Sequence, residues 1–469
     1  MRWFYLFLLF SLLYLATTPG HLYTVDSFVS FHTTESLVSK GSLVIPASII
    51  TVEDAQGRPT GRYGLLQAIL CIPLYLLGGT LDTFWPAPDF LESSWRMTLV
   101  ATFNQWVCAL GLVIFFLILY RLENKFWPAL AMTFVLGFAT PWWTYSRDLF
   151  RQPLAGVLIL LAIHAALEFR RSGRLLHLFL FGFAVGLTVT NRITTLVTWP
   201  GMFLLLLFDP KGRFQVSVRK VLWVAGTLTL LGIGLQIATN LWRFGDWWGP
   251  AYANRRFSLS ILKESLPVLL LSPNLGLVLF APVLALLLHG IVSTWRRDRV
   301  LALSLLAIVG AKFSLYAVYA DFRGGDNPGP RYLIPIVPAL ALFIGVLVCR
   351  EWKSFSLRMS LLALGALGFV INGFNTLVHY QESLTFWDRF LKWVGYPDYD
   401  LYPPFILSQD FADVMMGRWA ALGDWAPFIV YGGLLLLGIL YSIHKLQLLN
   451  LADWRARRAS EGLALHKSS

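Results

Sequence analysis

The sequence predicts an all-α integral membrane protein with about twelve transmembrane helices and a long first external loop. Hydrophobic residues make up 57% of its 469 residues and charged residues only 14%, whereas a soluble domain has about 25% charged residues. The mean hydropathy of the chain is +0.62. Apolar runs of roughly 17–25 residues recur from end to end, and each is long enough to cross a bilayer core about 30 Å thick.

The expected spans run from the N-terminus to the last apolar segment. They cover residues 2–18, 97–119, 126–143, 150–168, 174–190, 193–208, 219–242, 270–291, 299–319, 332–349, 357–378 and 426–444. An even number of crossings puts both termini on one side of the membrane. The spans form a single polytopic domain, 1–444, which is followed by a basic cytoplasmic tail, 445–469. The longest loops, 19–96 and 379–425, are expected on the external side.

Basic residues are unevenly divided between the two sets of helix ends. Near one set lie 21 of the 38 Lys and Arg residues but only 7 of the 26 acidic residues. Short basic loops therefore alternate with longer, slightly acidic ones, and the positive-inside rule makes the basic loops cytoplasmic. The net charge of +12 is explained by topology and does not indicate nucleic-acid binding. We expect a multi-pass protein of the prokaryotic plasma (inner) membrane with both termini cytoplasmic.

One apolar segment tests this topology. The stretch "YGLLQAILCIPLYLLGG", residues 63–79, carries Pro73 near its middle. A crossing there would invert every later loop and place basic residues outside. We therefore predict an interfacial or re-entrant helix within the first external loop, with a true crossing as the alternative. The first residues of the chain look like a signal peptide, but no A-x-A-like cleavage site follows, so we expect a retained helix.

Asp26 is the first candidate for chemistry. It lies about seven residues beyond the first span, in a stretch where Val25, Phe28, Val29 and Phe31 could face lipid as an interfacial helix. Held at a fixed depth, its carboxylate can accept a proton from a hydroxyl nucleophile, provided that desolvation raises its pKa toward working pH. The alternative is an ordinary solvated acid in a loop.

Arginine recurs beside glycine or acidic residues in four loops on the external side. These loops contribute Arg62; Arg147, Asp148 and Arg151; Arg243, Asp246, Arg255 and Arg256; and Asp321, Arg323, Asp326 and Arg331. The guanidinium group binds phosphate oxygens through a planar fork of donors, and glycine lets the backbone approach an anion closely. Each cluster alone suits a helix-end anchor or a local ion pair better, but their common side favours an anion-binding site.

Lys312 is a cation inside an apolar span. Nine residues separate it from Asp321, or about 14 Å of helix, which places it well inside the bilayer. A charge there costs roughly 2.5–3.5 kcal/mol on insertion scales, so Lys312 should face the bundle interior or a wet cavity. Snorkelling to the interface and a role near an anionic substrate stand as equal alternatives.

No cofactor is evident from the sequence. The three cysteines lie in apolar segments and predict neither a disulfide framework nor a metal site. His21 and His32 are isolated and are not spaced as a pair of metal ligands. A divalent cation held by Asp26 and Asp148 stays open.

Several segments together resemble a known family. They are "GRYGLLQAILCIPLYLLGG", "LGFATPWWTYSRDLFRQPLAGVLILLAIHAALE", "NLWRFGDWWGPAY" and "RGGDNPGPRYLIPIVPALAL". With the early Asp26 they resemble the polytopic GT-C glycosyltransferases, in particular bacterial relatives of protein mannosyltransferases and lipid A aminoarabinose transferases (glycosyltransferase family 39-like). The resemblance covers roughly residues 1–350 and implies a GT-C-like membrane fold whose first external loop contains interfacial helices.

The resemblance also implies an activity. Such enzymes move a sugar from a polyprenyl-phosphate carrier to a hydroxyl or amine of a lipid, polysaccharide or protein on the extracytoplasmic face (EC 2.4-type chemistry). Asp26 would be the general base, and Arg62 and Arg331 would contact the carrier phosphate. Asp148 is the second catalytic candidate. Further substrate-binding candidates are Tyr63, Arg147, Arg255, Arg256, Lys312, Arg323 and Tyr332.

Two positions depart from the family pattern. The family often has paired acids where this chain has Asp26–Ser27. An acid also commonly precedes the next external helix start, where this chain has Gln152. Asp148, one turn earlier, is the candidate to replace that acid.

Two other classes of function stay open. A lipid or solute transporter or flippase would show a two-fold internal repeat and ionisable residues on several mid-membrane helices, and no repeat is detectable in the sequence. A non-catalytic GT-C homologue would lack a cavity that joins Asp26 to Arg331. An enzyme predicts that Asp26, Arg62 and Arg331 line one cavity that opens to lipid.

Overall fold

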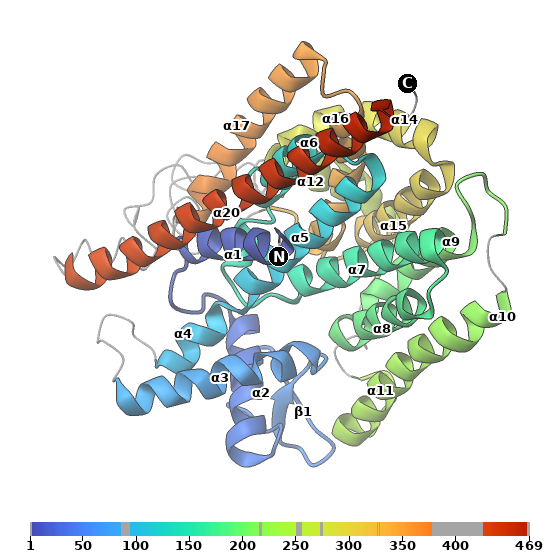
Figure 1. Ribbon diagram of the computed structural model, residues 1–469. Coiled ribbons are helices and arrows are strands. Elements are labelled where there is room, and N and C mark those ends of the chain that lie inside the picture. Colours follow the sequence, from blue (N-terminus) through green and yellow to red (C-terminus); the bar gives the residue numbers. More distant parts are fainter. Residues whose placement is uncertain are drawn as a thin grey trace, which may run out of the picture.

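The computed structural model describes residues 2–85, 94–214, 218–249, 256–272, 275–325, 327, 329–377 and 425–466. These residues form helices and one two-stranded hairpin, which confirms the predicted all-α membrane class (Figure 1). The N-terminal elements are α1 (Arg2–Leu15), α2 (Val25–Lys40), β1 (Thr51–Glu53), β2 (Pro59–Gly61), α3 (Leu66–Phe84), α4 (Trp95–Ala101), α5 (Phe103–Glu123) and α6 (Phe126–Phe138). The expected loop 379–425 lies almost entirely outside the described residues.

The remaining elements are helices and short 3₁₀ or π turns, the latter labelled η. First come η2 (Thr144–Ser146), α7 (Arg151–Ser172), α8 (Leu175–Asn191), η3 (Ile193–Thr198), α9 (Trp199–Leu207), α10 (Val218–Val221), η4 (Leu222–Gly226) and α11 (Thr227–Phe244). Then follow η6 (Leu259–Ile261), α12 (Leu262–Leu271), α13 (Leu277–Phe280), η7 (Pro282–Leu286), α14 (Leu287–Arg297), α15 (Arg299–Ala317), η8 (Arg331–Ile336), α16 (Val337–Arg350), α17 (Phe355–Leu377) and α20 (Trp425–His466).

Many of these helices are suited to a bilayer. Within the described residues, eight are long and apolar enough to cross it: Leu66–Phe84, Trp95–Glu123, Arg151–Ser172, Trp223–Phe244, Arg299–Ala317, Arg331–Arg350, Phe355–Leu377 and Ile429–Leu449. Shorter apolar helices are Arg2–Leu15, Phe126–Phe138, Leu175–Asn191 and Ile193–Leu207. Every expected span except 270–291 overlaps one of these helices.

The expected span 270–291 is wrong as a single helix. It is divided among α12, α13, η7 and α14. Pro282 stands at the first position of η7, directly after a break at Ala281. Proline has no N–H and cannot continue the hydrogen-bond ladder of a helix, so it begins a new segment there. Hydropathy does not register this break, because the residues on both sides of it are apolar.

Helix α3 is the segment whose crossing was in question. It packs against α2 and α4, and Figure 1 shows these helices together with the hairpin at one end of the molecule. The contact with α4 is close, because a Cβ added to Gly78 would lie 2.5 Å from the Cα of Arg96. The length of α3 would also allow a crossing. Its interfacial placement therefore stays a prediction.

The core is formed by helices that are apolar all around. The apolar windows of α16, α5 and α7 have 94%, 83% and 78% of their residues buried, whereas α11, α17 and α20 have 28% or less. A helix without a polar face is stable only inside the bundle or against lipid. The buried helices therefore form the centre, and α11, α17 and α20 lie at the periphery with one face available to lipid.

Helix ends that were expected to be cytoplasmic meet at one end of the bundle. Ion pairs join the loops there across long sequence distances: Arg121–Glu168 at 3.5 Å, Arg297–Glu123 at 3.0 Å and Arg170–Asp298 at 3.0 Å. The Nζ of Lys125 also donates to the carbonyl of Cys349 at 2.7 Å. The other set of helix ends, with the first loop, forms the opposite end, where the polar cavity described next is found.

Candidate active site

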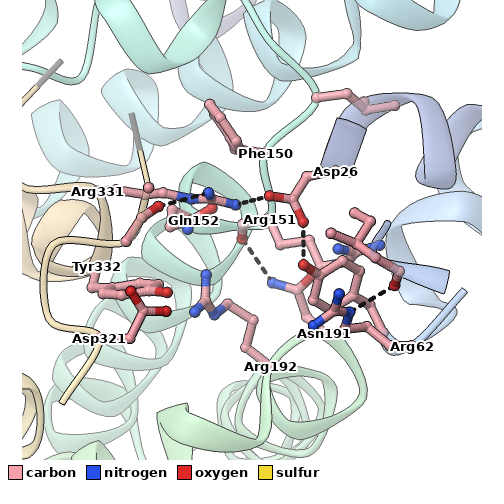
Figure 2. A pocket seen from close by; sticks show the side chains of 15 residues that line it. Asp26, Arg62, Phe150, Arg151, Gln152, Asn191, Arg192, Asp321, Arg331 and Tyr332 are labelled. Carbon is pink, nitrogen blue, oxygen red and sulfur yellow. Dashed lines mark hydrogen bonds and ion pairs between the residues drawn. The ribbon is translucent and has the colours of Figure 1, made fainter. Parts of the chain in front are cut away.

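A cavity of about 250 Å³ lies where the starts of α2 and α7, the end of α8 and the segment before η8 meet (Figure 2). It is lined by Asp26, Ile50, Arg62, Tyr63, Leu149, Phe150, Arg151, Gln152, Asn191, Arg192, Asp321, Gly324, Gly325, Arg331 and Tyr332. Four arginines and two aspartates stand among these residues, so the lining has a formal charge of +2. Such a cavity suits an anionic ligand. We call it the arginine-lined cavity.

Asp26 owes its position to the cap of α2. Thr24 has extended backbone angles, and its side chain accepts a hydrogen bond from the N–H of Ser27, so it is the N-cap. Asp26 lies in the first turn, where the helix dipole favours a negative charge. Its two carboxylate oxygens accept hydrogen bonds from the Tyr63 hydroxyl and from the Arg331 guanidinium.

These contacts decide the protonation of Asp26. Burial alone raises the pKa of Asp26, but the charge of Arg331, the hydrogen bond from Tyr63 and the charge of Arg151 outweigh it and hold this pKa below its usual range. Our expectation that desolvation raises the pKa of Asp26 is therefore wrong for the ion-paired state. While Arg331 holds it, the Asp26 carboxylate is therefore ionised at neutral pH.

Arg331 is presented by the glycine-rich turn before η8. Gly324 and Gly325 have φ of +74° and +85°, a left-handed conformation that residues with a Cβ rarely adopt. The Nη1 of Arg331 donates to the Gly324 carbonyl at 3.0 Å. Its guanidinium also lies 4.3 Å from the centroid of the Phe150 ring. The turn and the ring together fix Arg331 on the side of the cavity that faces Asp26.

The hairpin of the first loop brings Arg62 and Tyr63 to the cavity. Strands β1 and β2 pair antiparallel, and these two residues follow directly after β2. The Nε of Arg62 donates to the carbonyl of Ile50 at 2.7 Å. The guanidinium of Arg151, from the start of α7, lies 4.0 Å from the centroid of the Tyr63 ring. Tyr63 is thus placed between a cation and the carboxylate to which it donates.

The end of α11 is hydrogen-bonded to the backbone of the segment that carries Tyr63. Arg243, the penultimate residue of α11, donates to the Tyr63 carbonyl at 2.8 Å and to the Gly61 carbonyl. In return, the N–H of Ala55 in the hairpin turn donates to the Arg243 carbonyl at 2.8 Å. Arg243 itself is buried. The peripheral helix α11 is therefore bonded directly to the strand end that carries Tyr63.

Asn191 and Arg192 stand at the end of α8 and form the far wall. The Asn191 amide donates to the backbone carbonyl of Arg151 at 3.0 Å. The guanidinium of Arg192 lies 5.5 Å from the centroid of the Tyr332 ring and donates to the Tyr316 hydroxyl at 3.2 Å. Figure 2 shows its side chain pointing toward the middle of the cavity.

Lys312 does not line the cavity and contacts residues that pack behind this wall. It is completely buried in α15, and its Nζ donates to the carbonyl and the hydroxyl oxygen of Thr194, both at 3.0 Å. The Tyr316 hydroxyl donates to the same Thr194 hydroxyl at 3.1 Å, and the Tyr316 ring stacks on Tyr332 at 4.4 Å. Lys312 thus faces the bundle interior and supports residues of the cavity without lining it.

Asp148 and Arg147 are not in the arginine-lined cavity. Asp148 is buried behind α2, where it accepts hydrogen bonds from the Thr24 hydroxyl and the Leu149 N–H, each at 2.8 Å. Burial raises the pKa of Asp148 despite these bonds. The Nε of Arg147 donates to the Thr17 carbonyl at 3.1 Å. The structure places both side chains as anchors between the first loop and the start of α7.

The remaining candidates lie away from the cavity or outside the described residues. Arg323 is 39% exposed and pairs with Glu264 at 2.9 Å. Arg256 is exposed, and its carbonyl accepts from the N–H of Ala320 at 3.0 Å. Arg255 is not among the described residues. Neither Arg256 nor Arg323 lines the arginine-lined cavity, so their role in binding has no geometric support.

Ten lining residues were not among the predicted site residues, and five of these are polar or charged: Arg151, Gln152, Asn191, Arg192 and Asp321. Arg151 and Asp321 belong to the arginine-bearing external loops that were expected to favour an anion-binding site, whereas Asn191 and Arg192 do not. A signal for Arg192 was available, because "TNR" is a short polar break between two apolar spans and any charge there must find a wet partner. Asp26, Arg62, Tyr63, Arg331 and Tyr332, by contrast, were predicted and do share one cavity.

Metal ligands are sparse. No three His, Cys, Asp or Glu side chains of the described ranges gather closely enough to hold a metal ion. Asp148 borders a separate small cavity with Tyr23 and Arg147. Asp26 and Asp148 therefore do not face one another across a shared site.

Comparison with known proteins bears on the fold. No family model and no curated protein matches the sequence. The crystal structure of ArnT from Cupriavidus metallidurans bound to undecaprenyl phosphate is similar, with a TM-score of 0.50 and 13% identity over 94% of this chain and 73% of ArnT. The apo structure of ArnT gives a TM-score of 0.48 and 14% identity over 93% and 72% of the two chains. ArnT is a lipid A aminoarabinose transferase of the GT-C type. The chain is thus an integral, multi-pass membrane protein with the all-helical GT-C-like fold that its sequence predicts.

Proposed function

We propose that the protein is a membrane glycosyltransferase that moves a sugar from a polyprenyl-phosphate carrier to an acceptor hydroxyl or amine on the extracytoplasmic face. One observation carries the proposal: four arginines line the same cavity as the carboxylate of Asp26. One of these arginines, Arg331, donates a hydrogen bond to that carboxylate. ArnT has a similar fold and binds undecaprenyl phosphate. That likeness supports a polyprenyl-phosphate-linked donor.

The charge of the cavity matches the charge that such a reaction develops. A sugar linked to a carrier phosphate has one negative charge on the phosphodiester, and the released carrier phosphate gains a second. Cations fixed near the phosphate stabilise the leaving group more than the bound donor, which lowers the barrier. Arg62 and Arg331 are the predicted contacts, and Arg151 and Arg192 add to the field.

The chemical step requires one base and no further reactant. The acceptor oxygen or nitrogen forms a bond to the anomeric carbon while the bond between that carbon and the phosphate oxygen breaks. The electron pair leaves with the carrier phosphate, and the acceptor proton passes to Asp26. The donor is already activated, because the phosphate is a good leaving group.

Binding of the donor supplies the condition under which Asp26 can act. A phosphate that attracts Arg331 weakens the hold of this arginine on Asp26 and makes the carboxylate more basic. The hydrogen bond from Tyr63 keeps the carboxylate oriented meanwhile. The ion pair thus keeps the base inactive until a phosphate arrives.

Transfer by the purified full-length protein tests the proposal. Polyprenyl-phosphate sugars are supplied together with envelope fractions as acceptor, and release of free polyprenyl phosphate is followed by mass spectrometry. Asp26→Asn should lose at least about 100-fold in rate. Asp246→Asn alters an exposed acid after α11 and should behave like the parent. If Asp26→Asn releases carrier as fast as the parent, Asp26 is not the base. If the parent releases none from any donor, the function is wrong.

A further inference from the structure

Two neutral amides are buried in the wall of the arginine-lined cavity. Gln152 is 1% exposed, and neither its amide nitrogen nor its amide oxygen has a hydrogen-bond partner among the described residues. Asn191 is 2% exposed, and its nitrogen donates to the Arg151 carbonyl, but its oxygen has no partner among those residues. Both side chains line the cavity, and Figure 2 places Gln152 beside Arg331.

Buried amide groups of this kind point to a ligand. Leaving a buried donor or acceptor unsatisfied is costly, and an amide that lines a cavity, unlike one packed inside the bundle, is accessible to a ligand that satisfies it. The two amides together offer one NH₂ group that donates and two oxygens that accept. A sugar hydroxyl both donates and accepts, so it can satisfy the oxygen of one amide and the nitrogen of the other. A phosphate has only acceptors and leaves both oxygens unsatisfied.

The charges around the amides restrict the ligand further. Gln152 follows Arg151 in the chain, Asn191 precedes Arg192, and all four residues line the same cavity. An ammonium group placed there would be repelled by the guanidinium groups, because the lining keeps a formal charge of +2 even with Asp26, which Arg331 holds, and Asp321. A sugar carboxylate could accept from the arginines, but it has no proton to donate and would leave both amide oxygens unsatisfied. A neutral hydroxyl suits both the amides and their surroundings.

We infer that Gln152 and Asn191 form a subsite for the hydroxyl groups of a neutral monosaccharide, so that the transferred sugar has no amino or carboxylate group. The inference rests on the proposed function, because it concerns the sugar of the donor in the same cavity. A cavity of about 250 Å³ lies near the lower end of the usual range of small-ligand pockets, about 300–1,000 Å³, and it accepts one sugar rather than a chain of sugars. The chain would then differ from ArnT, whose name specifies an aminoarabinose.

Binding of three probes to the full-length protein in lipid nanodiscs tests the inference. The probes are the methyl diester of undecaprenyl phosphate, which has the same single negative charge as the donors and is called the bare carrier here, undecaprenyl phosphate linked to a neutral hexose, and undecaprenyl phosphate linked to a 4-amino-4-deoxypentose. We expect the neutral hexose donor to bind about fivefold or more tightly than the bare carrier, as one or two hydrogen bonds would provide. The amino-sugar donor should bind no more tightly than the bare carrier.

Two substitutions test whether Gln152 causes the higher affinity for the hexose donor. Gln152→Leu should bind the hexose donor and the bare carrier with equal affinity. Gln152→Glu should shift the preference toward the amino-sugar donor, because it supplies a carboxylate for the ammonium. Gln105→Leu is the matched control: Gln105 is also a buried amide without partners among the described residues, but it does not line the cavity, so this variant should keep the preference of the parent.

The outcomes separate the inference from the proposed function. If the parent binds none of the probes, the polyprenyl-phosphate donor itself is wrong. If it binds the bare carrier but gains nothing from the hexose, or prefers the amino sugar, the neutral-sugar subsite is wrong while the carrier site stands. These two comparisons use the parent alone, so they decide even if a variant fails to fold. A parent-like preference in a folded Gln152→Leu also overturns the subsite.

Discussion

Replacing Asp26 by Asn should change two measurable quantities in opposite directions, the affinity for the carrier phosphate and the rate of turnover. The substitution keeps the size of the side chain but removes the charge that holds the guanidinium. The two side chains are only 15% and 13% exposed, so solvent screens the pair weakly. A hydrogen bond to a charged group contributes about 1.5–3 kcal/mol, which corresponds to roughly a 10- to 150-fold change in a binding constant.

The expected result is tighter binding combined with slower turnover. Asp26 competes with the carrier phosphate for Arg331, so Asp26→Asn should bind bare polyprenyl phosphate at least about tenfold more tightly than the parent. Loss of the base should lower kcat by a factor of about 10²–10⁴. Titration calorimetry in nanodiscs measures the affinity, and single-turnover transfer measures the rate.

Asp321→Asn is the control for net charge. Asp321 lines the same cavity, and its substitution removes the same formal charge while the contact between Asp26 and Arg331 stays. Affinity gained by both variants reflects the charge of the cavity, and the additional gain of Asp26→Asn measures the release of Arg331. Equal carrier affinities for the two variants, or weaker binding by Asp26→Asn than by the parent, would refute the competition.

Further perturbations have defined outcomes. Arg331→Lys keeps the charge but loses the planar fork, so kcat should fall about 10²–10³-fold in a protein whose circular dichroism is unchanged. Lys312→Met removes a buried donor behind the cavity, so the KM for the donor should rise about fivefold with kcat maintained; an unchanged KM would deny Lys312 a supporting role. Thr24→Val removes the cap of α2 and a bond to a buried carboxylate, and thermal unfolding in detergent should show a loss of about 1–3 kcal/mol. Because the folded-state pKa of Asp26 lies below its ordinary value of about 3.9, its ion pair stabilises the protein above that pH and is lost as the pH falls through the lowered pKa. The Tm of the parent should therefore drop in acid below about pH 4, and that of Asp26→Asn should drop less.

The helical spans could be predicted from the sequence because a bilayer imposes one requirement, a long apolar run, on every crossing. The same criterion could not find the break at Pro282, where hydropathy stays high while the backbone hydrogen bonding changes. It also gave no sign of the hairpin between 51 and 61. Its strands are three residues each, too short for an alternating pattern to stand out.

Three arginines of the site, Arg62, Arg151 and Arg331, could be singled out from the sequence together with Asp26, but Arg192 was missed and the pairing of these groups could not be predicted. Arg331 is 305 residues away from Asp26 in the chain, so the sign of the shift in the pKa of Asp26 depends on a contact that only the fold defines. The same holds for Asp148, a catalytic candidate that the family resemblance suggested and that the fold uses to anchor α2. The residue types in the sequence showed which acidic and basic groups are present. Tertiary contacts decide which of these groups line the cavity and which of them pair with one another.

The bond from Arg243 to the backbone of Tyr63 links the peripheral helix α11 to the carboxylate of Asp26, because the Tyr63 hydroxyl donates to that carboxylate. Helix α11 packs against α8, but only 22% of its apolar window is buried, so a change in the thickness of the surrounding lipid can change its tilt. A change of tilt moves Arg243 near the end of the helix, and Arg243 is bonded to the segment after β2 whose tyrosine donates to Asp26. If the proposed function holds, the lipid therefore does more than dissolve the tail of the donor, because it also acts on the segment that orients Asp26.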